Sequence, residues 1–250
     1  MVIIGAGPVA VELAVALKSR GLKVTIIARS RIMRRLFDPD FSEIIRRIMI
    51  RNEVEVLVGQ KILEIKGNPV SQVITDQFNI DCDMVIVATG VRPNTDFLKG
   101  SGIQLGKNGG IKVNKTIQSS LPDIFAAGDC TEVPDYITGQ RRQNAIWPEA
   151  VEQGRIAALN IQGEYTEYQG AIQRNVVNIF DVPVLSIGHL EGKRETLLTS
   201  GVWRRYTKIE GRIVGTQIIG EIKTCGFMTS VIKKSTHPQW LSDKVFNKYF

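Results

Sequence analysis

The first twelve residues, M-V-I-I-G-A-G-P-V-A-V-E, constrain the fold of this chain more than any other stretch. A short run of β-forming residues, 2–4, leads into Gly5-Ala6-Gly7, and apolar periodicity predicts a helix from Pro8 to about residue 20. A strand, a glycine turn and a helix N-terminus in this order present backbone N–H groups and the positive end of the helix dipole to an anionic ligand. The spacing is that of a dinucleotide-binding fingerprint, with Ala10 at the third glycine position. Gly-Ala-Gly also occurs in many other tight turns, so the fingerprint indicates a dinucleotide site only if a second strand follows the helix.

That strand is predicted at residues 22–27, which completes a βαβ unit of the size that binds half of a dinucleotide. The residue that ends the second strand selects the cofactor, because an acidic side chain there bonds the adenosine ribose and repels a 2′-phosphate. Here the position is Ala28, and four arginines follow it: Arg29, Arg31, Arg34 and Arg35. Guanidinium groups bind phosphate through paired hydrogen bonds, so the sequence favours NADPH over NADH. The alternative is a basic loop that only faces solvent.

The rest of the first domain is expected to alternate helix and strands. A helix is predicted at 38–51 with Asp38 or Asp40 as its cap, and strands at 54–58, 62–65, 70–75 and 78–80. The apolar run 84–88 predicts a strand buried on both faces of the central sheet. It ends at Thr89-Gly90, and the domain is expected to end near Arg92.

A second strong signal is the stretch L-P-D-I-F-A-A-G-D-C at 121–130, after a strand-like segment at 111–113. Residues 124–127 are predicted to form a short buried strand, and Gly128 is expected to turn sharply and present Asp129. A carboxylate at such a strand end suits hydrogen bonding to a polyol. The helix predicted at 147–162 would point its N-terminus at the same ligand.

Three motifs in this order resemble the flavin-dependent pyridine nucleotide-disulfide oxidoreductases. They are Gly5-Ala6-Gly7-Pro8 with Glu12, Ala88-Thr89-Gly90 with Arg92-Pro93-Asn94, and the stretch 121–130. The resemblance covers nearly the whole chain and implies an α/β fold. A Rossmann-like NAD(P)H-binding domain is expected at 1–92, the C-terminal part of a FAD-binding domain at 93–165, and a small α+β C-terminal domain at 166–250.

The resemblance also implies roles for individual residues. The nicotinamide nucleotide and FAD would be bound by Gly5, Ala6, Gly7, Pro8, Val9, Ala28, Arg29, Arg35, Ala88, Thr89, Gly90, Gly128 and Asp129. Asp129 would hydrogen-bond the ribityl or pyrophosphate part of FAD. Glu12 would lie near the nicotinamide side of the flavin, as the one expected catalytic residue. No metal ligands are expected.

The C-terminal region narrows the resemblance to one branch of the family. Residues 203–219 predict two strands joined at Glu210-Gly211, and a helix is expected through Met228. This arrangement resembles the rubredoxin reductase-like, nitrite reductase-like and NADH oxidase-like members. The His-x-x-x-x-Glu pair of the dithiol-disulfide reductases is missing from the sequence, and His189 and His237 are interpreted as surface or core residues.

The family also carries an earlier glycine fingerprint for the ADP half of FAD, which this sequence lacks, together with the redox-active cysteine of members that have one. Since the chain starts one residue before a strand, we expect a fragment. The alternative is a separate polypeptide that supplies the FAD segment. Cys82 and Cys130 have no nearby resolving cysteine in the sequence, so neither is expected to replace the redox cysteine.

The cysteine content, the apolar runs and the net charge limit the cellular compartment and the classes of binding partner. Three widely separated cysteines without a C-x-x-C pair favour a reducing cytoplasm, and no apolar run reaches the roughly 20 residues of a membrane helix. The net charge of +7 is read as a solvated basic surface or, alternatively, as attraction to phosphates or to an acidic protein. Nucleic acid is not expected, because the basic residues do not alternate with exposed aromatic ones.

These observations predict a NAD(P)H-dependent flavoprotein oxidoreductase, or a part of one. Hydride would pass from NAD(P)H to FAD, and electrons to rubredoxin or another small redox protein, to oxygen or to another acceptor. The chain alone is expected to be inactive. The alternatives are a nicotinamide-nucleotide-binding fragment and a non-catalytic subunit without its own flavin. A homodimer is a further expectation.

Overall fold

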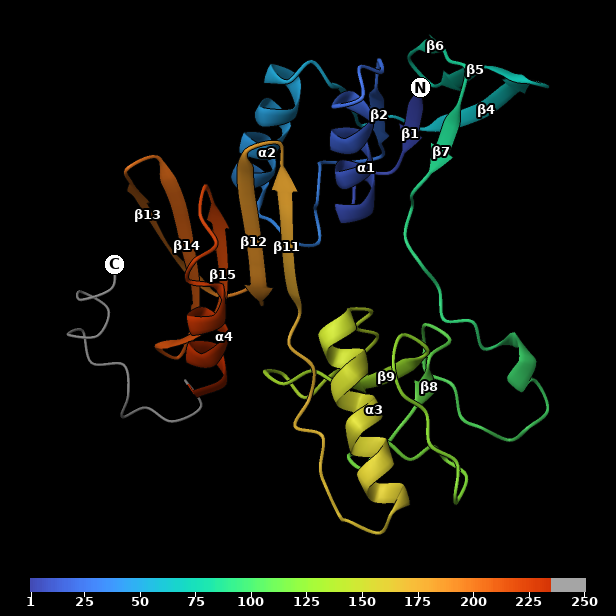
Figure 1. Cartoon of the computed structure of the whole chain (residues 1–250), viewed down its shortest axis with the longest axis vertical. Coiled ribbons are helices and arrows are strands. Elements are labelled where there is room, and N and C mark those ends of the chain that lie inside the picture. The colour runs from blue at the N-terminus through green and yellow to red at the C-terminus, as the bar shows by residue number, and fades with distance from the viewer. Residues whose placement is uncertain (235–250) are drawn as a thin grey trace. The chain divides into compact units, whose positions relative to one another are not determined.

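The computed structural model describes residues 1–234 and divides the chain into two compact units (Figure 1). The first unit joins Met1–Gly90 to the segment that begins at Asn175, and the second unit is Val91–Arg174. The chain therefore leaves the first unit and returns to it about 85 residues later. The boundaries at 92 and 165 that separate three functional domains stay a prediction.

A four-stranded parallel sheet forms the centre of the nucleotide-binding segment, in the order β3-β2-β1-β7. Ile3 on β1 pairs with Ile26 on β2, and both side chains are fully buried. Helix α1 covers them with Ala10 and Ala14, small residues that let the helix lie close to the sheet. The elements are β1 (Val2–Ile4), α1 (Pro8–Lys18), β2 (Thr25–Ala28), α2 (Pro39–Arg51), β3 (Glu55–Val58) and β7 (Val85–Val87). The predicted α/β class with a Rossmann-like sheet is confirmed.

A three-stranded antiparallel sheet connects β3 to β7. Its strands are β4 (Ile62–Gly67), β5 (Val70–Thr75) and β6 (Asn79–Asp81), in the order β4-β5-β6. Val73 and Cys82 pack against Val2 and Ile27 of the parallel sheet, so the small sheet shares a cluster of the core. The three short strands predicted here are confirmed, with shifted ends.

One prediction for this segment was wrong and another holds only in part. The strand at 84–88 was expected to be buried on both faces, but β7 is the edge of the described sheet and Val87 is 63% exposed. Apolar content alone cannot distinguish an edge from a centre, because strand order is a property of the tertiary fold. Asp38 is the N-cap residue of α2, which confirms one of the two predicted caps, although its side chain makes no capping hydrogen bond. The Asp38 carboxylate is turned instead towards arginines of the C-terminal segment.

A five-stranded antiparallel sheet begins at Arg174, in the order β11-β12-β15-β14-β13. Its strands are β11 (Arg174–Ile179), β12 (Val182–Gly188), β13 (Lys193–Thr199), β14 (Val202–Ile209) and β15 (Arg212–Ile219), and helix α4 (Cys225–Lys234) follows. Both Glu210 and Gly211 have positive φ, as a two-residue hairpin turn with right-handed strand twist requires. The predicted hairpin and the helix after it are confirmed, whereas β11 to β13 were not predicted.

This sheet packs against the nucleotide-binding segment. Val177, Ile179 and Val184 lie in one core cluster with residues of α1 and α2, and Figure 1 shows α2 beside β11 and β12. At the N-terminal end of α2, the rings of Phe41 and Trp203 meet edge to face with their centroids 6.5 Å apart. The C-terminal sheet is thus an integral part of the unit that contains the glycine turn.

The second unit is smaller and is built around one helix. It contains η1 (Asp96–Leu98), β8 (Ile111–Lys112), β9 (Thr131–Pro134), β10 (Arg141–Arg142) and α3 (Trp147–Ile161), and its sheet has the order β10-β9-β8. Ile156 of α3 packs against Ile111 and Val133 of the sheet. The predicted helix is confirmed. The strand predicted at 124–127 is wrong, because only Phe125 forms a single bridge, to Gln118, and Ile124 is 40% exposed.

None of the helices in the described chain is long and apolar enough to cross a membrane.

Candidate nucleotide-binding site

The glycine turn joins the ends of three parallel strands. Gly5 follows β1 with φ +125°, and a Cβ at this position would lie 2.1 Å from the carbonyl oxygen of Ala88. The Gly5 N–H donates to the carbonyl of Ile27 at 2.9 Å, which ties the turn to the end of β2. Only glycine permits both the positive φ and this close approach. The turn therefore lies at the carboxyl edge of the sheet, where open α/β folds bind their ligands.

Gly7 caps helix α1 but has a different physical role. Its φ of −79° is open to any residue, and a Cβ there would have nothing within 4 Å. The N–H groups of Gly7, Val9 and Ala10 have no acceptor among residues 1–234, as expected for the first turn of a helix. Pro8 occupies the first helical position, where no N–H is needed. Free donors and open space at a helix N-terminus form an anion-binding site.

The arginine-bearing loop, residues 29–37, begins directly after β2. Ala28 is buried at the strand end, and the exposed guanidinium groups of Arg29, Arg34 and Arg35 make no hydrogen bond or ion pair to any described residue. Arg31 differs, because its Nη2 donates to the carbonyl oxygens of Arg34 and of Phe37, at 3.2 and 3.4 Å. Three of the four predicted phosphate-binding arginines thus have free guanidinium groups, and the fourth stabilises the loop itself.

The loop is also attached to the glycine turn, since the Met33 N–H donates to the Ala6 carbonyl at 2.7 Å. The segment Ala88-Thr89-Gly90 lies next to the glycine turn, because the Ala88 N–H donates to the Ile4 carbonyl at 2.8 Å. The structure therefore brings the glycine turn, the end of the second strand and Ala88-Thr89-Gly90 to one edge of the parallel sheet. Glu12 lies exposed on α1, and its catalytic role stays a prediction.

The turn at Gly128-Asp129 belongs to the second unit and is held by α3. Gly128 has φ +89°, and its N–H donates to Oε1 of the fully buried Gln153 at 2.8 Å. The hydroxyl of Thr131 lies within hydrogen-bond distance of the same oxygen, also at 2.8 Å. The Asp129 side chain is exposed, and its carbonyl accepts a bond from Gln143. The residues present therefore fit a polyol ligand at an exposed carboxylate on a rigid turn.

Sequence reasoning missed Gln153. The signal was available, since Gln153 lies three and four positions before Ile156 and Ala157 and so shares the buried face of α3. A glutamine on an apolar helix face indicates a buried hydrogen-bond partner.

We expect Gln153→Leu to lower the free energy of unfolding by about 2 kcal/mol, because it leaves the partly buried Gly128 N–H without an acceptor. Chemical denaturation measures this loss. The control is Gln162→Leu, which changes an exposed glutamine at the end of the same helix. Equal effects of the two substitutions would contradict the proposed support of the turn.

The ionisable groups near this turn do not favour a reactive thiol. Burial raises the pKa of Cys130, and it also raises the pKa of Cys82 in the first unit. A raised pKa keeps both thiols protonated and poorly nucleophilic near neutral pH. Neither these residues nor Cys225 forms a disulfide in the described chain. Among residues 1–234, no group of three or more His, Cys, Asp or Glu residues could hold a metal ion.

Comparison with known proteins identifies the family. Residues 1–154 match the family described as pyridine nucleotide-disulphide oxidoreductase, which is more than half of the chain. The chain belongs to this family. It is 33% identical over 240 residues to an NADH oxidase of Methanocaldococcus jannaschii, a match that covers 87% of this chain and 53% of the relative. It is 34% identical over 195 residues to a CoA-dependent NAD(P)H sulfur oxidoreductase of Pyrococcus furiosus, with 77% and 44% covered.

The chain thus spans about half the length of the curated relatives it matches. Solved structures of the family share its fold. A water-forming NADH oxidase from Lactobacillus brevis, with NADH bound, superposes with a TM-score of 0.83 at 25% identity over 94% of this chain and 58% of that one. An engineered NADPH oxidase made from it, with NADPH bound, gives a TM-score of 0.83 at 27% identity with the same coverage.

The predicted membership of the pyridine nucleotide-disulfide oxidoreductases is therefore confirmed. His237, which was interpreted as non-catalytic, lies outside the described residues. His189 lies after β12, where its backbone N–H donates to Val214.

Proposed function

We propose that this chain is the NADPH-binding part of a flavoprotein oxidoreductase and carries part of the FAD site in residues 93–165. The choice of NADPH rests on the arginine-bearing loop after β2. The strand before it ends in Ala28 and not in an acidic residue, and the guanidinium groups of Arg29, Arg34 and Arg35 have no partner among the described residues. A 2′-phosphate would meet three free cations there and no repelling carboxylate at the strand end.

The engineered NADPH oxidase supports this choice. It differs from its parent NADH oxidase by five substitutions. The first replaces a glycine with alanine, and the second replaces an aspartate with alanine 18 positions later. The next two positions change from alanine to arginine and from methionine to serine, and a proline 5 positions further on becomes arginine. The introduced residues have the identity and spacing of Ala10, Ala28, Arg29, Ser30 and Arg35 in this chain. The natural sequence thus carries all five residues that distinguish the engineered NADPH oxidase from its NADH-using parent.

In this proposal, each part of the site binds one part of the nucleotide. The free N–H groups of the first turn of α1 bind the pyrophosphate, and Gly7 leaves room for its close approach. Arg29 and Arg35 bind the 2′-phosphate, and Glu12 lies towards the nicotinamide. Asp129 binds the polyol part of FAD from its rigid turn. FAD, when bound, accepts hydride from the nicotinamide and passes electrons on.

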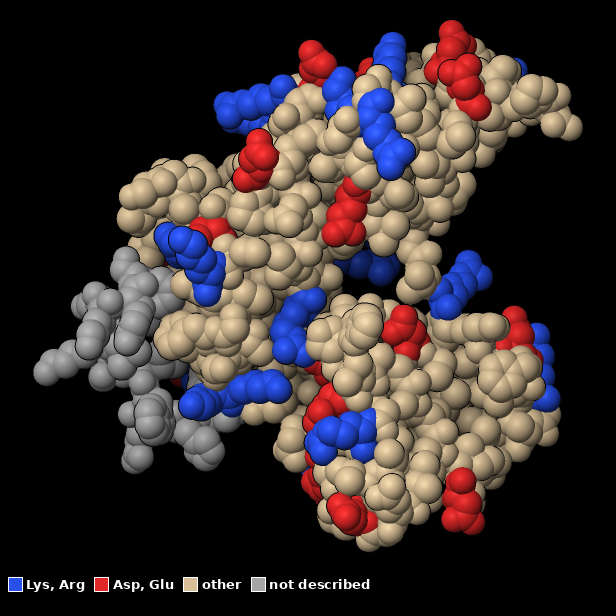
Figure 2. All heavy atoms as spheres, in the orientation of Figure 1, with Lys and Arg blue, Asp and Glu red and all other residues tan. Residues whose placement is uncertain are grey.

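The electron acceptor is proposed to be a small redox protein such as rubredoxin, or oxygen. Figure 2 shows basic and acidic side chains mixed over the visible face. An acidic partner would therefore be recognised by a local group of cations and not by a uniformly basic face. A cytoplasmic location is proposed because the three cysteines form no disulfide.

Thermal unfolding of the purified chain tests the proposal. We expect a colourless protein whose melting temperature rises by about 5–10 °C at an NADPH concentration of ~100 Kd, since ligand binding stabilises only the folded state. In a chain that also contains a FAD-binding segment, NADPH should bleach the flavin absorbance near ~450 nm.

The outcomes separate the alternatives. A chain that is stably yellow holds FAD on its own, which would contradict a purely nicotinamide-binding fragment. A chain whose melting temperature responds to neither NADPH nor NADH would overturn the proposed function. A longer flavin-containing chain that neither nucleotide bleaches would support a non-catalytic subunit.

A further inference from the structure

A buried aspartate holds the end of the arginine-bearing loop. Asp38 directly follows this loop, and its side chain is only 4% exposed. Its backbone N–H donates to Oε1 of Gln217 at 2.8 Å, while Nε2 of Gln217 donates to the Asp38 carboxylate at 2.9 Å. One residue of β15 therefore binds both the main chain and the side chain of Asp38.

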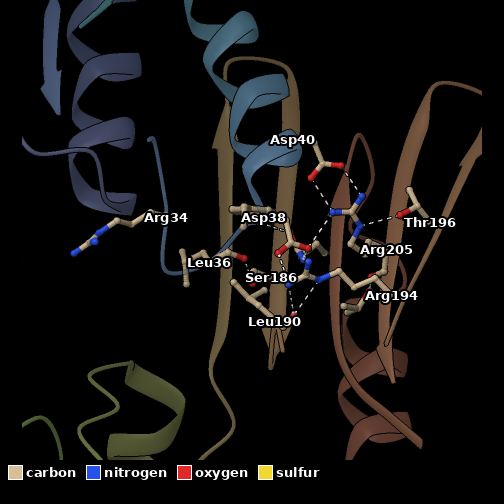
Figure 3. Close-up of polar contacts among 12 residues, drawn as sticks. Arg34, Leu36, Asp38, Asp40, Ser186, Leu190, Arg194, Thr196 and Arg205 are labelled. Carbon is tan, nitrogen blue, oxygen red and sulfur yellow. Dashed lines mark hydrogen bonds and ion pairs between the residues drawn. The ribbon is translucent and has the colours of Figure 1, made fainter. Parts of the chain in front are cut away.

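Two arginines of the C-terminal segment complete this cluster (Figure 3). Nη1 of Arg205 donates to Oδ2 of Asp38 at 3.0 Å, and Arg194 lies 3.2 Å from Oδ1. Arg205 also makes a paired contact with the Asp40 carboxylate, at 2.8 and 2.6 Å, and its Nε donates to Thr196. Its guanidinium lies 4.6 Å above the ring of Phe41. Every polar atom of Arg205 is thus directed to a fixed partner.

A second attachment lies just before Asp38. The hydroxyl of Ser186, on β12, donates to the carbonyl of Leu36 at 2.6 Å. In Figure 3, Arg34 points away from this cluster, so the attachment holds the loop and leaves that arginine available. Residues that lie about 150 to 180 positions later in the sequence thus hold the loop that carries the proposed phosphate-binding arginines.

We propose that Arg205 is a positioning residue for nicotinamide nucleotide selection, which acts through Asp38 to hold the arginine-bearing loop in the form that receives a 2′-phosphate. The inference rests on the proposed function, because it assigns the loop to NADPH. Arg205 does not touch the nucleotide in this scheme. It fixes the main chain at the end of the loop, so that Arg29 and Arg35 need little further ordering when the phosphate binds.

The neighbouring residue supplies a matched control. Arg204 lies on the same strand, is similarly buried at 17% against 11% for Arg205, and pairs with a carboxylate at 2.8 Å. Its partner is Glu221, which is not connected to the loop. Arg204→Gln therefore removes a comparable ion pair from the same sheet without releasing Asp38.

The experiment compares Arg205→Gln with Arg204→Gln in the full chain. For each, titration gives the Kd of NADPH and of NADH, and hydrogen exchange reports the protection of residues 29–38. We expect Arg205→Gln to raise the Kd of NADPH about tenfold and that of NADH less than about threefold, because NADH has no 2′-phosphate for the loop to bind. Exchange in residues 29–38 should rise at least ~fivefold. Arg204→Gln should leave all three measurements within about twofold of the wild type.

If Arg205→Gln does not fold, Asp38→Asn makes the same test, since it removes the charge that both arginines bind and keeps the side-chain size. Equal nucleotide affinities and equal loop exchange in the Arg205 and Arg204 variants would overturn the inference. Wild-type protein that binds neither nucleotide would overturn the proposed function instead, and the exchange data would still show whether Arg205 holds the loop.

Discussion

Replacing Arg29 with glutamate will weaken NADPH binding by about 100-fold and NADH binding by less than about fivefold. Arg29 is the first residue after β2, and its guanidinium has no partner among the described residues. A charge-assisted hydrogen bond contributes about 1.5–3 kcal/mol, and the new carboxylate adds repulsion of the dianion. Fluorescence or calorimetric titration of the purified chain with both nucleotides measures the two losses.

Arg20→Glu is the control for the change in net charge. Arg20 is exposed just beyond the end of α1, so it lies at the opposite end of that helix from the glycine turn. This substitution should change either affinity by less than about twofold, because solvent and salt screen distant surface charges. If Arg29→Glu weakened NADPH and NADH equally, the arginine-bearing loop would be an ordinary solvated surface.

The second large effect is the loss of stability when Gly5, but not Gly7, is replaced with alanine. Gly5→Ala should destabilise the fold by at least ~3 kcal/mol and lower the melting temperature by about 10 °C. The cause is a Cβ placed 2.1 Å from the Ala88 carbonyl oxygen, in a backbone conformation with φ +125°. The neighbour is main chain, so it cannot move aside as a flexible side chain would.

Gly7→Ala should leave the melting temperature of the free chain within ~2 °C of the wild type. Its φ of −79° is ordinary, and its added Cβ meets nothing within 4 Å. The same methyl group would stand where the pyrophosphate approaches the helix, so we expect the affinity for NADPH to fall about tenfold. Circular dichroism and titration on the same samples distinguish the two roles. Unchanged NADPH affinity in the Gly7 variant would argue against a pyrophosphate at this helix.

Most correct predictions concern features whose physical cause lies within a few residues. The turn at Gly5–Gly7, the helix that follows it and the hairpin at Glu210-Gly211 depend on the backbone freedom of glycine and on side-chain periodicity within a few residues. The order of the three motifs was sufficient to recognise the family. The errors share another cause. The exposed edge of β7 and the missing strand before Gly128 depend on which segments of the chain pair with them in the fold. A short stretch of sequence does not specify these neighbours.

The candidate site shows the same difference between local and tertiary causes. The sequence by itself predicted the phosphate-binding chemistry that we propose, because Gly7, Ala28 and Arg29 would act through their own backbone or side-chain groups. Only the tertiary structure decided that Arg31 is used within its loop, and that the side chain of the N-cap residue Asp38 is bound by Arg205 and not by the first turn of α2. The physical reason is distance along the chain. Asp38 and Arg205 are 167 residues apart and meet only because the C-terminal sheet packs on α2, which no local pattern specifies.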